Sequence, residues 1–268
     1  MLRTRKSFIQ LSMMTLGILL IASGCKNEET PAKTTSYNLM VKDILGVSGS
    51  VTFTELNANS ATVDIVLVNA PAGTHPANLY MNSTIENGLV EIALNPVDAT
   101  GKSSTVVTTM SYRELIAFDG NIKILNSVID RYTIVAQADI GGNLITSTKK
   151  SYPLNVVGSY GVSGTALFEK RLNGNTLLTL SMVGVIPGDT YPATINLGSV
   201  ESVGGGPFVK LLNNVNGTTG KSYTNIQELD GGADITYANW LVYDGYINVY
   251  QSYIALENII SQGNIGSN

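Results

Sequence analysis

An internal repeat is the feature of this sequence that most constrains its fold. The stretch SYNLMVKDILGVSGS at residues 36–50 aligns without a gap with SYPLNVVGSYGVSGT at residues 151–165, and eight of the fifteen positions are identical. The match resumes at the far end, where IVAQADIGGN (134–143) pairs with IISQGNIGSN (259–268). Self-similarity at one long period indicates that a single structural unit is present twice.

The two copies span residues 36–143 and 151–268, and the short polar segment 144–150 is expected to link them. The offset between the copies is 115 residues at their start, whereas the repeats of a solenoid have roughly 20–45 residues. The sequence therefore predicts two tandem domains, each large enough to enclose a core of its own.

Apolar residues alternate with polar ones along much of each copy, which is the pattern of half-buried strands. Examples are Val63, Ile65 and Leu67, and later Ile122 and Ile124. About seven or eight short strands separated by turn residues fit into each copy. We therefore predict an all-β chain with two tandem antiparallel Greek-key β-sandwich domains, and a closed barrel is the alternative architecture.

One short helical segment and one turn recur in both copies. The stretch SYRE at 111–114 has the spacing of a capping box, which predicts a turn or two of helix ending near Phe118. Thr236 begins the equivalent segment, TYANWLVYDG. The tripeptide Gly-Lys-Ser occurs at 101–103 and again at 220–222, and we interpret it as a shared structural turn.

Residues 1–24 have the organisation of a lipoprotein signal peptide, with basic residues, an apolar stretch and then small residues. The apolar stretch is shorter than the ~20 residues of a membrane-spanning helix, so we expect the segment to be removed. The residues ASGC at 22–25 resemble the bacterial lipobox, which implies that Cys25 becomes the acylated first residue of the mature chain. Cys25 is the only cysteine, and an ordinary signal peptide before a stray cysteine is the alternative.

Residues 25–35 are expected to form a flexible acidic tether. Its run KNEET at 26–30 resembles the tag that sends some lipoproteins to the outer face of the outer membrane. We therefore expect a protein held in the outer membrane by fatty-acyl chains such as palmitate on Cys25, with its domains facing the cell exterior.

Charge excludes one class of partner. Removing residues 1–24 takes away three of the 16 basic residues and none of the 20 acidic ones, so the formal charge becomes −7. The phosphate backbone of a nucleic acid repels such a chain, and we expect no nucleic-acid partner.

Motifs in both copies resemble the CHRD domain, a family named from chordin and widespread in bacterial secreted proteins. The first copy carries them as PAGTHPANLYMNS, GKSSTVVTTMSYRELIAFDGNIKIL and TIVAQADIGGN. The second copy carries them as GDTYPATINLGS, GKSYT, TYANWLVYDGYINVY and IISQGNIGSN. The resemblance covers nearly all of both copies, and it implies a fold related to that of copper/zinc superoxide dismutase.

Members of that family often have a His-x-His pair after Pro-Ala and a third histidine after Asp-Gly-Tyr, a set that can hold a metal ion. None of these positions is a histidine here; they are Asn78, Tyr80 and Leu125 in the first copy, and Thr194, Asn196 and Tyr250 in the second. Because these side chains are poor ligands for transition metals, we expect no metal site, no cofactor and no catalytic residue. The only histidine, His75, aligns with Tyr191, and we interpret it as a surface or packing residue.

Aromatic residues gather late in the second copy. Those that we single out as possible ligand contacts are Tyr237, Trp240, Tyr243, Tyr246 and Tyr250. Aromatic side chains with polar tips are common at binding surfaces, and packing in the domain core is the alternative role.

Together these features predict a non-enzymatic cell-envelope lipoprotein whose two CHRD-like domains serve as a binding or structural module. The partner is expected to be an extracellular protein or a polysaccharide. Two other functions stay open: a metal-dependent redox protein similar to superoxide dismutase, and a carbohydrate-binding surface lipoprotein.

Overall fold

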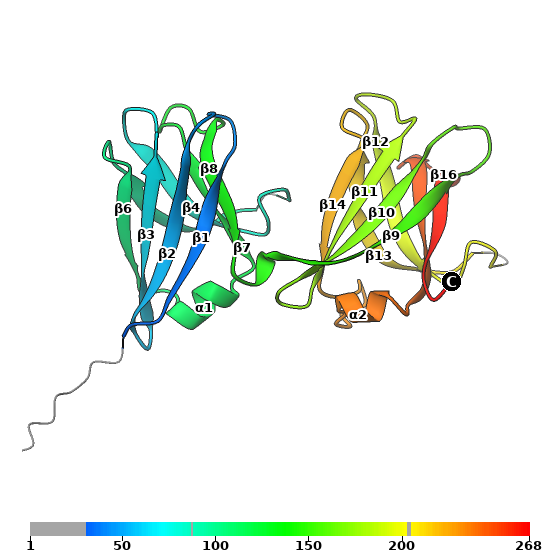
Figure 1. Ribbon diagram of the computed structural model, residues 1–268. Helices are drawn as coiled ribbons and strands as arrows, with labels where there is room; N and C mark the ends of the chain where they lie inside the picture. Colours follow the sequence, from blue (N-terminus) through cyan, green and yellow to red (C-terminus); the bar gives the residue numbers. More distant parts are fainter. Residues whose placement is uncertain (1–30, 87, 203–204) are drawn as a thin grey trace, which may run out of the picture. The chain divides into compact units, whose positions relative to one another are not determined.

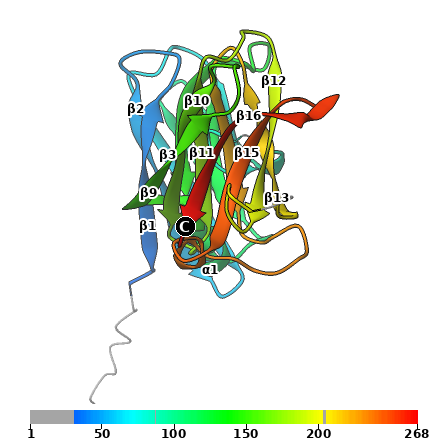
Figure 2. The same ribbon diagram turned by 90° about the vertical axis from the view of Figure 1, so that its right-hand side faces the viewer.

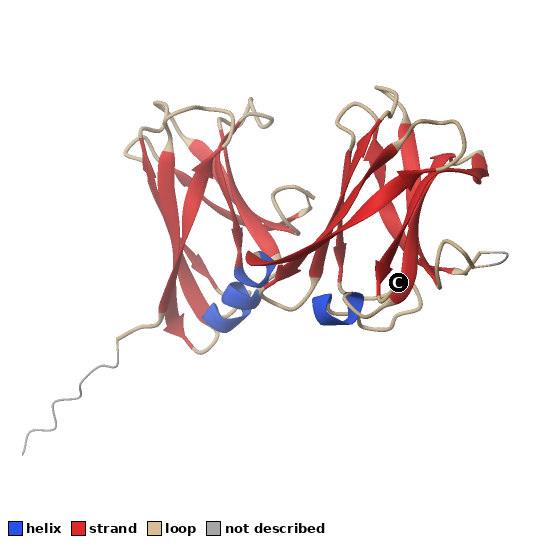
Figure 3. Cartoon of the chain, turned by 45° about the vertical axis from the view of Figure 1, so that its right-hand side comes forward, coloured by secondary structure: helices blue, strands red, loops and turns tan. Residues whose placement is uncertain are grey.

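The computed structural model describes residues 31–86, 88–202 and 205–268, so the signal peptide, Cys25 and most of the tether lie outside the described residues. Strands make up most of the described chain, and its helical segments are short (Figure 3). Within the described part, no helix has the length and apolar character needed to span a membrane.

The first repeat forms one eight-stranded antiparallel sheet (Figure 1). Its strands are β1 (Thr34–Val41), β2 (Ser48–Asn57), β3 (Ser60–Val68), β4 (His75–Met81), β5 (Val90–Val97), β6 (Lys102–Val107), β7 (Gly120–Leu125) and β8 (Ile134–Ile140). Their order in the sheet is β5-β4-β7-β8-β1-β2-β3-β6. Since β3 neighbours β6 rather than β4, the connection crosses over in the manner of a Greek key.

The second repeat has the same strand order, closed into a barrel. Its strands are β9 (Ile145–Val156), β10 (Ser163–Arg171), β11 (Thr176–Val183), β12 (Thr190–Leu197), β13 (Phe208–Asn216), β14 (Lys221–Ile226), β15 (Asp244–Ser252) and β16 (Ala255–Gly266). Figure 2 shows β15 and β16 side by side. The barrel closes where Asn216 of β13 pairs with Lys221 of β14, a strand pair whose counterparts β5 and β6 are the two edges of the first sheet. The prediction of an all-β chain with two antiparallel domains is confirmed, and the second domain takes the barrel form that the sequence left as an alternative.

An asparagine bridges the same two strands in both repeats. In the first, the backbone N–H of Asn95 in β5 donates to Oγ1 of Thr105 in β6 at 2.8 Å, and its side-chain amide donates to a β6 carbonyl at 2.7 Å. In the second, Asn213 makes the matching bond to Oγ1 of Thr224 at 2.9 Å. In the first repeat these contacts cover polar groups of the edge strands β5 and β6 that would otherwise be open to pairing, whereas in the second repeat they add to the β13–β14 pair of the closed barrel.

Each repeat encloses its own apolar core, in which alternate strand residues point inward. Phe53, Ile122 and Leu115 are fully buried in the first, and Phe168 and Trp240 are fully buried in the second.

Both predicted helical segments are present with reciprocal caps. Helix α1 (Tyr112–Ala117) starts at Ser111, whose hydroxyl accepts from the N–H of Glu114 while the Glu114 carboxylate accepts from the Ser111 N–H. Helix α2 (Tyr237–Trp240) starts at Thr236 with the same exchange through Asn239. The capping-box prediction is confirmed.

Residues 144–150, predicted as a link between the copies, instead lie mostly within β9, which pairs with β10 from Ile145 to Leu154. The early residues of β9 are almost all exposed. A strand without a buried face has no apolar alternation, so the sequence pattern that marks other strands is missing here.

Candidate functional site

The positions that correspond to the CHRD histidines lie on the outer face of the sheet in both repeats. Ala77 and Leu79 of β4 point into the core and are buried, so Asn78 and Tyr80, which alternate with them, face outward. Residues paired across neighbouring strands share a face, which places Thr194 of β12 beside Asn248 of β15.

In the second repeat these outward side chains form a hydrogen-bonded cluster. Oγ1 of Thr194 lies 3.0 Å from the Tyr250 hydroxyl and accepts from the Asn196 amide at 3.1 Å. The Asn248 amide donates to the Tyr250 hydroxyl at 3.4 Å. In the first repeat, the Asn78 amide donates to the Tyr80 hydroxyl at 3.2 Å.

These donor sets do not fit a transition metal, because hydroxyl and carboxamide groups are weak ligands compared with imidazole and thiolate. No three His, Cys, Asp or Glu side chains of the described residues come together as a metal-binding group.

His75 is a buried packing residue with 1% of its surface exposed. Its Nδ1 lies 2.8 Å from the carbonyl oxygen of Asn126, and its Nε2 lies 2.9 Å from that of Pro71. Tyr191, its counterpart, has a similar role, since its hydroxyl accepts from the N–H of Ile186 at 2.8 Å. Both side chains tie the start of an equivalent strand to the preceding loop.

Next to the second-repeat cluster, on the same face, lies a pocket of about 340 Å³. Thr194 and Tyr250 line it together with Phe208 of β13 and Tyr253 from the turn between β15 and β16. Phe208 is 61% exposed and Tyr253 is 58% exposed. Large apolar side chains left in water around a concavity are a common property of binding sites.

The five predicted aromatic contacts separate into two groups. Tyr237, Trp240 and Tyr246 are buried in the domain, and Tyr243 packs against Trp240 with ring centroids 4.8 Å apart. Only Tyr250 lines the pocket. Core packing therefore explains most of this aromatic cluster.

Sequence reasoning missed Phe208, whereas Tyr253 belongs to the late aromatic segment that the sequence brings to notice as possible ligand contacts. Phe208 begins a strand after a glycine-rich loop, and Tyr253 lies at a hairpin tip. No local pattern shows that the two rings line one pocket, because this depends on the pairing of β12 with both β13 and β15.

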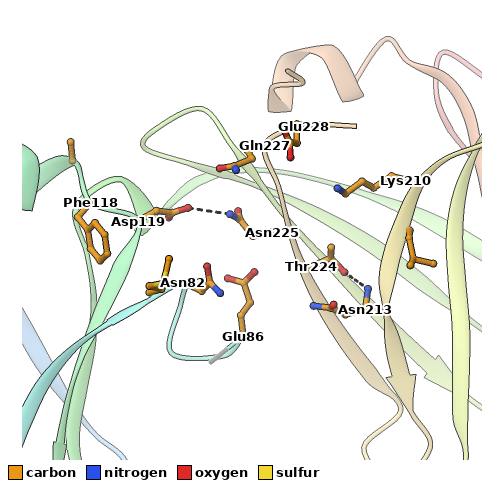
Figure 4. Close-up of a pocket in the computed structure, with 13 residues that line it drawn as sticks. Asn82, Glu86, Phe118, Asp119, Lys210, Asn213, Thr224, Asn225, Gln227 and Glu228 are labelled. Carbon is orange, nitrogen blue, oxygen red and sulfur yellow. Dashed lines mark hydrogen bonds between the residues drawn. The ribbon is translucent and has the colours of Figure 1, made fainter. Parts of the chain in front are cut away.

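A second, polar cleft of about 650 Å³ lies between residues 117–119, just before β7, and the strands β13 and β14 (Figure 4). Across it, the Asn225 amide donates to Oδ2 of Asp119 at 3.1 Å. Lys210 and Glu228 also line the cleft, whereas its apolar lining is limited to a few side chains such as Phe118.

A buried arginine holds one side of this cleft. Arg171 has no exposed surface, and its guanidinium forms an ion pair with Glu86 and a longer one with Asp119 at 3.5 Å. It also donates to the carbonyl oxygen of Asn143 at 3.4 Å. Burial raises the pKa of the Asp119 carboxyl above its ordinary value, and the positive charge of Arg171 opposes that rise.

Two carboxylates of the cleft, Glu86 and Asp119, are thus already paired with Arg171, and the apolar pocket is the better candidate for a ligand site. Comparison of the chain with models of known protein families finds no match, and comparison with curated proteins finds none either.

Proposed function

We propose that this chain is a non-enzymatic lipoprotein of the cell envelope that binds an extracellular protein or polysaccharide through its repeats. The observation that carries the proposal is the exposed pocket on the outer face of β12, β13 and β15. Phe208 and Tyr253 supply large and rigid contact area there, at a low cost in side-chain entropy.

A polysaccharide is the partner that the polar groups of this pocket favour. Thr194 and Tyr250 bring hydroxyls next to the aromatic rings, and the Asp230 carboxylate, which pairs with Lys210 at 2.9 Å, lies at the same pocket. Aromatic faces beside a few fixed hydrogen-bonding groups suit a ligand with an apolar face and polar edges, as a sugar ring has.

A glycan array tests this proposal. The wild-type protein should bind at least one glycan class, and the exposed-ring variants Phe208→Ser and Tyr253→Ala should lose that binding. Tyr132→Ala is the matched control, because Tyr132 is 95% exposed on the first repeat, away from the pocket. If the wild type and the three variants bind glycans equally, this pocket is not the glycan-binding site.

A redox function has less support, because the positions that hold histidines in CHRD domains are occupied by Asn78, Tyr80 and Thr194 among others. The only histidine of the chain already contacts two carbonyl oxygens. Stoichiometric copper or zinc in the purified protein, together with superoxide dismutation, would establish the redox function instead.

Acylation at Cys25 is the second part of the proposal, and it rests on the lipobox-like residues 22–25. A Cys25→Ser variant should lose its acyl chains and leave the membrane fraction. Retention of this variant in the outer membrane would contradict the lipid anchor.

Display on the cell exterior is the third part, and it rests on the acidic run after Cys25. Protease added to intact cells should degrade the protein, while a periplasmic marker stays whole. Complete protection would place the domains on the periplasmic side of the outer membrane.

A further inference from the structure

The first repeat has a pocket at the same place as the one just described. Its volume is also about 340 Å³. Six of its seven lining residues have their repeat counterparts in the lining of the second-repeat pocket; these six are Pro76, Asn78, Val90, Leu125, Val128 and Arg131. Recurrence of one concavity in both copies shows that it belongs to the fold.

The equivalence follows from sequence and pairing. Residues 123–137 align with 248–262 at one offset, so Arg131 corresponds to Leu256 and Leu125 to Tyr250. Val90 pairs with Tyr80 just as Phe208 pairs with Asn196, so Val90 and Phe208 correspond as well.

The two pockets nevertheless differ in chemistry. Where the second repeat has the aromatic residues Phe208 and Tyr250, the first repeat has the smaller aliphatic residues Val90 and Leu125. Where the second repeat has Leu256, the first repeat has Arg131. No carboxylate of the described residues lines the first-repeat pocket, whereas Asp230 lines the other.

The loop that carries Arg131 positions the guanidinium of this residue beside the first-repeat pocket. Its Nε donates to the carbonyl oxygen of Val128 at 3.0 Å, and no other described residue pairs with its terminal nitrogens. The neighbouring Asp130 carboxylate is turned to other partners, since it accepts from the Asn126 amide at 3.0 Å and from the Thr133 N–H at 3.2 Å. The ammonium of Lys123 adds positive charge 5.5 Å from the Tyr80 ring, which also lines the pocket.

We propose that the first-repeat pocket binds an aliphatic group that carries a carboxylate. The aliphatic part contacts Val90, Leu125 and Val128, and the carboxylate accepts hydrogen bonds from the guanidinium of Arg131. This site goes beyond the proposed function, because it requires nothing of the second-repeat pocket. The aliphatic carboxylate is either the C-terminal residue of a peptide or a free short-chain acid.

Calorimetric titration of the full acylated protein in lipid nanodiscs tests the site with three water-soluble probes. N-acetyl-leucine represents a peptide end, N-acetyl-leucinamide is the same molecule without the charge, and 3-methylbutanoate is the free acid. N-acetyl-leucine should bind, and its amide should bind about tenfold more weakly, which is the change expected when one charge-assisted hydrogen bond is lost. Stronger binding of 3-methylbutanoate than of N-acetyl-leucine would identify the free acid as the source.

Two variants make the test specific. Arg131→Gln should weaken binding of N-acetyl-leucine by about tenfold, while Arg113→Gln, which alters an exposed arginine on α1, should leave it unchanged. Phe208→Ser, which alters the second-repeat pocket, should also leave binding of N-acetyl-leucine unchanged. The variants Arg131→Gln and Phe208→Ser therefore distinguish failure of the first-repeat site from failure of the proposed function. The proposal is overturned if N-acetyl-leucine and its amide bind equally, if neither binds, or if Arg131→Gln has no effect.

Discussion

The guanidinium of Arg171, at the end of β10, pairs with the carboxylate of Glu86, which lies between β4 and β5. The Arg171 side chain is fully buried, and that of Glu86 is 6% exposed. This contact joins residues of the two repeats, so Arg171 has a role that its counterpart in the first copy, Leu56, does not share. A charge in such a place is tolerated only because it is paired.

Replacing Arg171 with an uncharged residue should therefore strongly destabilise the folded protein. We expect Arg171→Met to lower the free energy of unfolding by about 3–5 kcal/mol, because the buried Glu86 carboxylate and the partly exposed Asp119 carboxylate would be left without a cation. Urea denaturation measures this. Adding Glu86→Gln to Arg171→Met should recover part of the loss, while Arg113→Met on the surface should change stability by less than about 0.5 kcal/mol. A single variant as stable as the wild type would contradict the assigned role.

Asp139 gives a prediction for how protein stability depends on pH, and its counterpart in the second repeat provides a control. Burial raises the pKa of the Asp139 carboxyl, whose Oδ1 accepts from the N–H of Thr84 at 2.7 Å. A raised pKa means that the folded protein holds this proton more tightly than the unfolded chain, so stability falls as pH rises from the ordinary carboxyl pKa through the folded value. Asp139→Asn keeps an acceptor oxygen and should remove this part of the pH dependence in urea titrations at several pH values.

The counterpart of Asp139 in the second repeat is already an asparagine. Oδ1 of Asn264 accepts from the N–H of Val200 at 2.8 Å, and its amide donates to Glu201 at 3.3 Å. Asn264→Asp should therefore destabilise the protein at neutral pH, because the new carboxylate would face that of Glu201. A stabilised Asn264→Asp variant would show that the two positions are not equivalent.

His75 should matter for stability and not for metal binding. His75→Ala removes a buried ring whose two nitrogens lie within hydrogen-bond distance of the carbonyl oxygens of Asn126 and Pro71, so we expect a loss of about 2–3 kcal/mol from lost packing and hydrogen bonding. Thermal unfolding measures the loss, and Tyr191→Phe should cost about 1 kcal/mol through its single bond to Ile186. A rise in the wild-type Tm on adding zinc or copper, absent in His75→Ala, would contradict this view.

The two helix caps should contribute similar stability. Ser111→Ala and Thr236→Ala each remove a hydroxyl that accepts from the third residue of its helix, and each should cost about 1 kcal/mol. Thr108→Ala is the control, because Thr108 is exposed just before the first cap. If all three variants unfold at the same denaturant concentration, the caps are not stabilising.

Local patterns made several features predictable. The repeat defined two units, alternation of apolar residues marked most strands, and the SYRE motif located α1 at Tyr112–Ala117. The comparison of His75 with Tyr191 predicted a surface or packing residue and left the choice open, and the structure buries both side chains. The first half of β9 was missed, because a strand exposed on both faces has no alternation to detect.

The sequence by itself determined the duplicated all-β architecture and the turn and cap chemistry, because these depend on residues close together in the chain. The tertiary structure alone decided that Phe208 and Tyr253 line one pocket with Thr194, that Arg131 and Leu125 line another, and that Arg171 pairs with Glu86. Such contacts join residues up to 85 positions apart. They arise from strand order and register, which a Greek-key sheet fixes through pairings that no local pattern of residues encodes.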